Sequence, residues 1–154
     1  MKVVCNTSPL LLLAKIQRLP LLAQLYTTIL VPGAVLDELG AKPDQETTQI
    51  QAFVDNGSFV HGNVTLQMLT DIPVSLGRGE RAAIALAHAA VANLVILDDR
   101  QGRRLAHASG LAVTGTAGVL VEARARGLLP ALRPELERLR AVGLWLSEAW
   151  YHRL

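Results

Sequence analysis

Cysteine, histidine and long apolar runs are scarce in this chain of 154 residues. Its one cysteine, Cys5, excludes an intrachain disulfide and favours a reducing compartment. No apolar run approaches the roughly 18 residues that span a bilayer, and polar residues 6–9 interrupt the apolar start of the chain, so no export signal is expected. These absences predict a cytoplasmic protein with no membrane segment.

Charge is also scarce. Charged residues make up 18% of the chain, hydrophobic residues 51%, and the formal net charge is +2. This composition excludes a disordered chain and predicts one domain over residues 1–154. The slight positive charge is compatible with nucleic acid but does not argue for it. The apolar excess, with Trp145 and Trp150 as core or interface anchors, predicts a homodimer.

Short aliphatic runs alternate with helical patterns along the chain. Strands are expected at Lys2–Cys5, Thr27–Val31, Leu94–Leu97 and Leu111–Thr114, with one or two more within Ser58–Thr70. The pattern predicts an α/β, Rossmann-like domain whose central, mostly parallel sheet is flanked by helices. Expected helices are 10–17, 20–26, 33–40, 42–56, 78–92, 101–109, 116–126 and 131–142, and a last one follows Ser147.

The clearest helical pattern covers residues 78–92. Glu80, Ile84, Ala87 and Val91 fall on one face, so a carboxylate heads an apolar, core-facing stripe. Carboxylates seldom face a core unless they are paired. Glu80 is therefore a candidate functional residue.

Two adjacent aspartates, Asp98 and Asp99, follow the buried strand at 94–97. Ligands of open α/β sheets bind outside the carboxyl ends of the strands, so chemistry is expected there. Capping of the next helix would explain one aspartate, and Asp98 is the one for which an N-cap role suffices. After the first strand, Ser8 is expected to cap a helix in which Pro9 takes the first position.

Several oxygen-bearing side chains are expected at this one edge of the sheet. Clustered carboxylates repel unless a cation neutralises them, and oxygen ligands without a His or Cys cluster point to Mg²⁺ or Mn²⁺. Either Glu38 or its neighbour Asp37 supplies one carboxylate. The expected set is Asn6, Ser8, Glu38, Glu80, Asp98, Asp99 and Thr116, flanked by Arg78, Arg81, Arg100, Arg103 and Arg104 as phosphate contacts.

Each of these residues also has a plain structural interpretation. Ser8 and Thr116 suit helix caps, and Glu80 suits the positive end of a helix dipole. The arginines of the helix at 101–109 suit a solvated face. The four histidines have no metal-binding spacing and are interpreted as structural or surface groups.

Four ordered motifs resemble those of PIN domains, above all the small prokaryotic proteins related to VapC toxins. The motifs are residues 6–10 (NTSPL), 31–39 (VPGAVLDEL), 76–80 (LGRGE) and 97–100 (LDDR), and 113–116 (VTGT) is also similar. The resemblance implies a Mg²⁺- or Mn²⁺-dependent ribonuclease acting on single-stranded RNA, with an antitoxin protein and a second copy of the chain as partners.

The resemblance also implies roles for individual residues. Glu38, Glu80 and Asp99 match acidic metal-binding positions, Asp98 matches a less regular acidic position, and Ser8 matches the hydroxyl residue of the first motif. Asn6 departs from the pattern, because an aspartate is usual there. An asparagine still ligates through its carbonyl oxygen but brings no negative charge, so the metal affinity should fall.

Two functions therefore follow from the sequence. The first is a metal-dependent endoribonuclease, as the toxin of a toxin–antitoxin pair, with Glu38, Glu80, Asp98 and Asp99 as catalytic residues, Asn6 as a further metal ligand, and Ser8, Arg78, Arg100 and Thr116 as substrate contacts. The second is a catalytically weakened module that binds RNA or a protein partner. A dinucleotide-binding domain is disfavoured, because residues 76–80 lack the third glycine of a dinucleotide loop.

Overall fold

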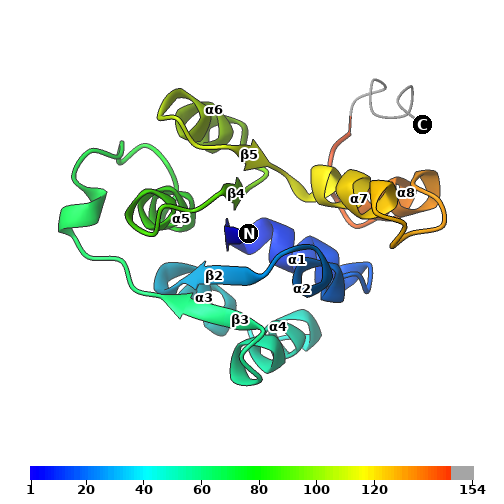
Figure 1. Cartoon of the computed structure of the whole chain (residues 1–154). Helices are drawn as coiled ribbons and strands as arrows, with labels where there is room; N and C mark the ends of the chain where they lie inside the picture. The colour runs from blue at the N-terminus through cyan, green and yellow to red at the C-terminus, as the bar shows by residue number, and fades with distance from the viewer. Residues whose placement is uncertain (147–154) are drawn as a thin grey trace.

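A five-stranded sheet forms the centre of the protein in the computed structural model, which describes residues 1–146 (Figure 1). The strands lie in the order β3-β2-β1-β4-β5, and every neighbouring pair is parallel. This confirms the predicted α/β fold with a parallel sheet. The strands are β1 (Lys2–Cys5), β2 (Thr28–Pro32), β3 (Phe59–Gly62), β4 (Leu94–Ile96) and β5 (Val113–Thr114).

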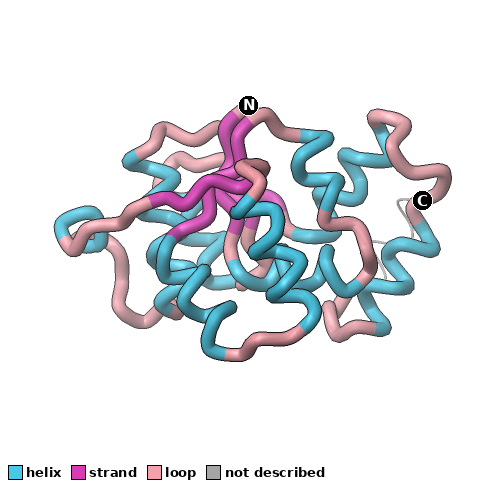
Figure 2. The backbone as a smooth tube through the Cα atoms, turned by 90° about the horizontal axis from the view of Figure 1, so that it is seen from below, coloured by secondary structure: helices cyan, strands magenta, loops and turns pink. Residues whose placement is uncertain are grey.

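Helices cover both faces of the sheet, as Figures 1 and 2 show. Side chains alternate across a strand, so Val3 and Cys5 of β1 join one buried cluster and Val4 joins the other. The first cluster packs under α1 (Thr7–Lys15), α2 (Pro20–Leu25), α3 (Gly33–Ala41), α4 (Gln45–Asp55), α7 (Thr116–Ala125) and α8 (Arg133–Ala141). The second packs under α5 (Arg78–Ala89) and α6 (Arg100–Ala108).

The strand order reverses at β1. The chain passes from β1 outward to β2 and β3, then returns to the other side of β1 as β4 and β5. Parallel strands end at the same edge of the sheet, and ligands of such folds bind where the order reverses. The segments that follow β1 and β4 therefore occupy the expected position for a binding site.

Helix α1 begins earlier than the sequence suggested. Asn6 is its N-cap, with an extended backbone, and the Asn6 amide donates to the Ile96 carbonyl at 3.0 Å. The strand ladder thus continues to Asn6 and the helix begins at once with Thr7. The prediction that Ser8 caps this helix was wrong, and so was Pro9 as its first residue.

The apolar stripe of α5 is shorter than predicted. Ile84 and Ala87 are buried, but the helix ends at Ala89, and Val91 is left-handed and 83% exposed. The Ala92 amide donates to the Ala87 carbonyl and closes the helix. The prediction that Val91 faces the core was therefore wrong.

The less regular segments confirm one expectation, that of one or two strands within 58–70, and correct another. The 58–70 region holds one strand, β3, and a 3₁₀ helix, η1 (Gln67–Leu69). Trp145 is 81% exposed and is not a core anchor. Trp150 and the helix expected after Ser147 lie outside the described residues. Among residues 1–146, no helix combines the length and apolar character that crossing a bilayer requires.

Candidate active site

Buried polar side chains are few, and one of them has an atom without a partner. Of the three among residues 1–146, Glu135 accepts from Arg18 at 2.6 and 3.0 Å, and Thr116 donates to Asp98 at 2.6 Å. The third is Asn6, whose Oδ1 atom is buried without a hydrogen-bond partner. An unpaired buried oxygen costs about 1–3 kcal/mol, so this atom marks a place where a ligand is expected.

Glu38, from the middle of α3, approaches the same place. A Cβ atom added to Gly79 would lie 2.5 Å from Glu38 Oε1 and 2.9 Å from Asn6 Oδ1. Only a glycine lets these two oxygens approach the first turn of α5 so closely. The Thr7 hydroxyl donates to the other carboxylate oxygen, Oε2, at 2.9 Å, and so orients Glu38.

Glu80 and Asp99 both lie close to Gly102 of α6, but their carboxylates have different surroundings. A Cβ atom added to Gly102 would lie 3.3 Å from Asp99 Oδ2 and 3.6 Å from Glu80 Cγ. Asp99 is the N-cap of α6 and accepts from the Gly102 amide at 2.7 Å, while the Glu80 carboxylate turns back onto Gly77 at the start of α5. Because Gly79 and Glu80 are neighbours, the Asn6–Glu38 pair and the Glu80 side chain both lie at the first turn of α5.

Asp98 has a different environment from Asp99. Its Oδ1 accepts from the Thr116 amide at 2.8 Å, and its Oδ2 accepts from the hydroxyls of Thr116 and Ser8 at 2.6 and 3.1 Å. Asp98 thereby joins the end of β4 to the first turns of α1 and α7. The predictions that Asp98 caps α6 and that Thr116 caps α7 were wrong, because Asp99 and Gly115 are those N-caps.

The thiol of Cys5 is buried, and the charge of Asp98 affects its pKa. Burial, and secondarily the negative charge of Asp98, raise the pKa of Cys5 well above its usual value. Cys5 therefore stays protonated and packs as a small apolar residue, as the sequence suggested.

The oxygen donors at this edge are of the type that binds a hard divalent cation, but the carboxylates are not gathered into one site. Within residues 1–146, no three His, Cys, Asp or Glu side chains are close enough together to hold a metal ion. A site here needs the Asn6 oxygen as well as the carboxylates. The Asn6 oxygen is buried and unpaired, and the Glu38 carboxylate lies beside it. Oxygen donors of this kind, without nitrogen or sulfur, fit Mg²⁺ or Mn²⁺.

The arginines near this edge differ in how they are held. Arg78 pairs with Asp37 at 3.0 Å on the surface, whereas Arg81 donates to the Leu69 and Ile72 carbonyls at 3.2 and 3.1 Å. A Cβ atom on Gly115 would lie 2.6 Å from Arg103 Nη1, so Arg103 reaches toward the Asp98 region. Arg100, the first residue of α6, is exposed.

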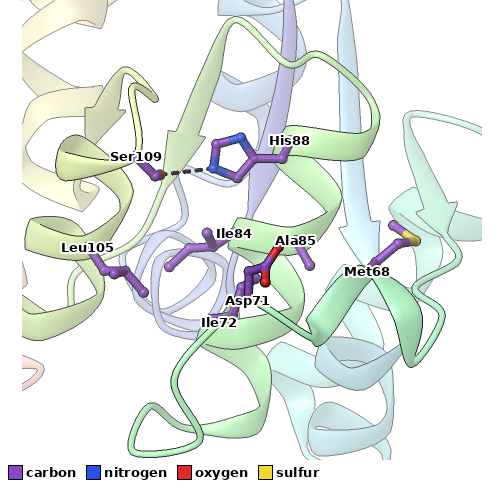
Figure 3. A pocket seen from close by; sticks show the side chains of 8 residues that line it. All are labelled: Met68, Asp71, Ile72, Ile84, Ala85, His88, Leu105 and Ser109. Atoms are coloured by element: carbon purple, nitrogen blue, oxygen red, sulfur yellow. Dashed lines mark hydrogen bonds between the residues drawn. The ribbon is translucent and has the colours of Figure 1, made fainter.

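A separate cavity of about 310 Å³ lies near the other end of α5 (Figure 3). His88 Nε2 and Ser109 Oγ are 2.9 Å apart there, but the Ser109 hydroxyl donates to the Ala106 carbonyl at 2.8 Å. The serine is thus the acceptor toward His88, and the pair is not arranged to activate a nucleophile. This agrees with the structural role expected for His88.

Comparison with known proteins identifies the class of this fold. A family model described as PIN domain matches residues 2–154, so the chain belongs to the PIN-domain family. No curated protein matches the chain. The chain is similar to one chain in the crystal structure of VapBC2 from Rickettsia felis bound to a DNA fragment from their promoter, with a TM-score of 0.53 and 14% identity. That match covers 75% of this chain and 98% of the other, and at such low identity it shows the fold alone.

Sequence reasoning missed two residues of this site. Thr7 orients Glu38, and Gly79 leaves room for the two oxygens that meet above it. Thr7 stood unassigned beside Asn6 in the first motif. Gly79 was visible as a glycine in the first turn of an otherwise strong helix, where a residue of low helix propensity often permits a close approach.

Proposed function

We propose that the protein is a metal-dependent endoribonuclease of the PIN type and the toxin of a toxin–antitoxin pair. The observation that carries this proposal is the unpaired, buried Oδ1 of Asn6 beside the Glu38 carboxylate, both above Gly79 at the carboxyl edge of β1. This edge is where parallel folds bind ligands, and the donors are those that Mg²⁺ and Mn²⁺ prefer.

Asn6 and Glu38, whose oxygens meet above Gly79, would hold the cation. Glu80 and Asp99 would have to turn toward it, because no three acidic side chains of residues 1–146 lie close enough together to hold a metal ion as placed. When bound, a divalent ion lowers the pKa of a coordinated water and neutralises charge on a phosphodiester that is being cleaved. Thr7 keeps Glu38 oriented through its hydroxyl, and the backbone amide of Gly102 does the same for Asp99. Arg78 and Arg100 would hold phosphates of single-stranded RNA on either side of the site.

Asp98 contributes to this function by position rather than by contact. Its carboxylate oxygens are engaged by Ser8 and Thr116, so it fixes the start of α1 beside the end of β4. Asn6 follows β1 at the start of α1, and Asp99 follows β4, so Asp98 holds the segments that carry both residues together. We therefore assign Asp98, Ser8 and Thr116 to the support of the site, in place of the catalytic role predicted for Asp98 and the substrate contacts predicted for Ser8 and Thr116.

An antitoxin is the expected protein partner. The similar fold from Rickettsia felis comes from a VapBC2 complex bound to promoter DNA, which supports a cognate antitoxin for this chain as well. A homodimer in the reducing cytoplasm completes the proposal. Co-expression with the neighbouring reading frame, followed by size-exclusion chromatography with light scattering, tests both partners.

The test of cleavage uses purified protein, a labelled single-stranded RNA and Mn²⁺. Loss of a residue that only supports a metal ligand typically costs 10–100-fold, so Glu38→Gln and Asp99→Asn should each lower the rate by about 100-fold or more. Asp55→Asn, which neutralises an acid at the C-terminal end of α4, away from Glu38, is the matched control and should keep the rate. Undiminished cleavage in Glu38→Gln and Asp99→Asn would refute the assignment.

The neutral Asn6 favours a second candidate, a PIN module that binds RNA or a protein without cutting RNA. An amide brings no charge to the ion, and the three carboxylates do not form a compact cluster. This candidate predicts RNA binding with no cleavage in Mn²⁺, and gain of cleavage in Asn6→Asp. The nuclease proposal predicts cleavage by the natural chain.

A further inference from the structure

A second cavity, of about 310 Å³, is lined in part by α3 and α5, the two helices that also carry Glu38 and Gly79. Its lining comes from the start of α3, from residues 63–69 after β3, and from the first turns of α5. Figure 1 shows how these segments follow β2 and β3 at the carboxyl edge of the sheet. The size of the cavity is at the lower end of the roughly 300–1,000 Å³ typical of ligand sites. Asp37 and Arg78 line it, and their sequence neighbours Glu38 and Gly79 belong to the candidate active site.

One cation of this cavity has no counter-ion. Arg81 is half-buried, and its two hydrogen-bond acceptors, the Leu69 and Ile72 carbonyls, are neutral. Its Nε atom is buried without a partner, and no ion pair of Arg81 exists within the described residues. A partly buried guanidinium with an unused donor favours an anion nearby.

The second cation of the cavity is held by an anion that can exchange. Arg78 Nη2 lies 3.0 Å from Asp37 Oδ2, with side-chain exposures of 69% and 65%. Exposed pairs of this kind contribute little, about 0–1 kcal/mol, so an arriving phosphate can replace the carboxylate. The Asp37 carboxylate thus occupies the position of an anionic ligand of Arg78.

We propose that this cavity binds a backbone phosphate of single-stranded RNA next to the cleaved bond, through Arg78 and Arg81, and that Asp37 competes with that phosphate for Arg78. The proposal rests on the ribonuclease function above and deepens it. Asn63 lines the same cavity and offers amide groups to the sugar or base, and Leu66, which is 87% exposed, offers an apolar surface to a base.

The test measures binding apart from cleavage. A fluorescein-labelled single-stranded RNA is titrated with the full chain in EDTA, and the dissociation constant is read from anisotropy at several salt concentrations. Arg78→Ala should weaken binding about 5- to 10-fold and lower the salt slope by about one. Arg124→Ala removes an exposed arginine of α7, far from the cavity, and should keep the affinity within about twofold.

The most informative variant is Asp37→Asn, because it is expected to bind RNA more tightly. A variant that had merely lost structure would not show a higher affinity for RNA. Freeing Arg78 should tighten binding about 2- to 5-fold, and the gain should vanish in the double variant Asp37→Asn/Arg78→Ala. Arg81→Lys keeps the charge but loses the planar guanidinium, and should weaken binding without lowering the melting temperature by more than a few degrees.

The outcomes separate this proposal from the proposed function. If the chain cleaves RNA in Mn²⁺ while Arg78→Ala and Asp37→Asn bind RNA as the natural chain does, the phosphate site is wrong and the nuclease stands. If the binding pattern is as expected but no RNA is cut, the phosphate site stands and the nuclease is wrong. No binding to RNA at low salt overturns the phosphate site.

Discussion

Two polar regions lie side by side at the carboxyl edge of the sheet and differ in how far their hydrogen bonds are satisfied. In the first, which we call the Asp98 cluster (Ser8, Asp98 and Thr116), both carboxylate oxygens accept hydrogen bonds. In the second, the Asn6–Glu38 pair, Asn6 Oδ1 is buried without a partner. A satisfied buried network rigidifies a fold, whereas an unsatisfied one stores a cost that a ligand can relieve.

The difference assigns separate tasks to residues that look alike in the sequence. Asp98 and Asp99 are adjacent acids, yet Asp98 joins three elements and Asp99 caps one helix beside Glu80. The Asp98 cluster is expected to matter for stability with or without metal. The Asn6–Glu38 pair is expected to matter for metal binding.

The largest effect is expected from Asp98→Ala. It leaves the Thr116 amide and two hydroxyls without their charged acceptor, so the free energy of unfolding should fall by about 3 kcal/mol. Urea denaturation measures this. Asp99→Asn is the matched control, because asparagine caps helices as well as aspartate does, and its stability should change by less than about 0.5 kcal/mol. Equal effects of the two variants would remove the distinction between these aspartates.

The next largest effect is expected from Asn6→Asp. A second carboxylate beside Glu38 adds charge repulsion in a buried position, so the metal-free protein should lose about 1–3 kcal/mol of stability. Mn²⁺ should restore most or all of it, because an ion at 100 times its dissociation constant stabilises by about 2.7 kcal/mol. Thermal melts with EDTA and with Mn²⁺ measure both changes. A variant that Mn²⁺ does not stabilise more than the natural chain would speak against a cation at Asn6.

Gly79→Ala tests the space between Asn6 and Glu38. The added methyl group would meet Glu38 Oε1 and Asn6 Oδ1, so the rise in melting temperature on adding Mn²⁺ should largely disappear. The fold should survive, since alanine is better in helices than glycine by up to about 1 kcal/mol. Gly40→Ala, in α3, has open space around the new Cβ and should keep the full response to Mn²⁺.

The smallest effect concerns alkaline pH. The pKa of Cys5 is raised in the folded protein by burial and by Asp98, relative to about 8.5 in an unfolded chain. Its contribution is present below pH 8.5, and stability should fall as the pH rises above that value, because the unfolded chain loses the proton first. Urea unfolding between pH 7 and 10 measures the slope. Cys5→Ala should flatten it, and an unchanged slope would assign the loss to other groups.

The fold and the position of the site were predictable from the sequence because they follow from local patterns. Alternating aliphatic runs and helical stripes indicated the parallel sheet, and parallel strands that share an edge indicated that Asn6, Glu80 and Asp99 would lie at that edge. The family motifs added Glu38. What the motifs could not give was the orientation of each side chain.

Those orientations depend on contacts between residues far apart in the chain. Ser8 and Thr116 are residue types that cap helices. In the structure their hydroxyls instead donate hydrogen bonds to Asp98, which is 90 residues from Ser8 and 18 from Thr116. The helix caps then fall to Asn6 and Gly115. Likewise, the pairing of Arg78 with Asp37 across 41 residues has no signature in the sequence.

The most direct test of the central claim is a calorimetric titration of the metal-free protein with Mn²⁺, beside Glu38→Gln, Glu80→Gln and Asp99→Asn. If oxygens of Asn6 and Asp99, which follow β1 and β4, and of Glu38 and Glu80 from α3 and α5 hold one cation, the natural chain should bind one Mn²⁺, and each variant should bind it about 10-fold or more weakly. A natural chain that takes up no Mn²⁺ at millimolar concentration, or variants that bind Mn²⁺ as tightly as it does, would contradict the account.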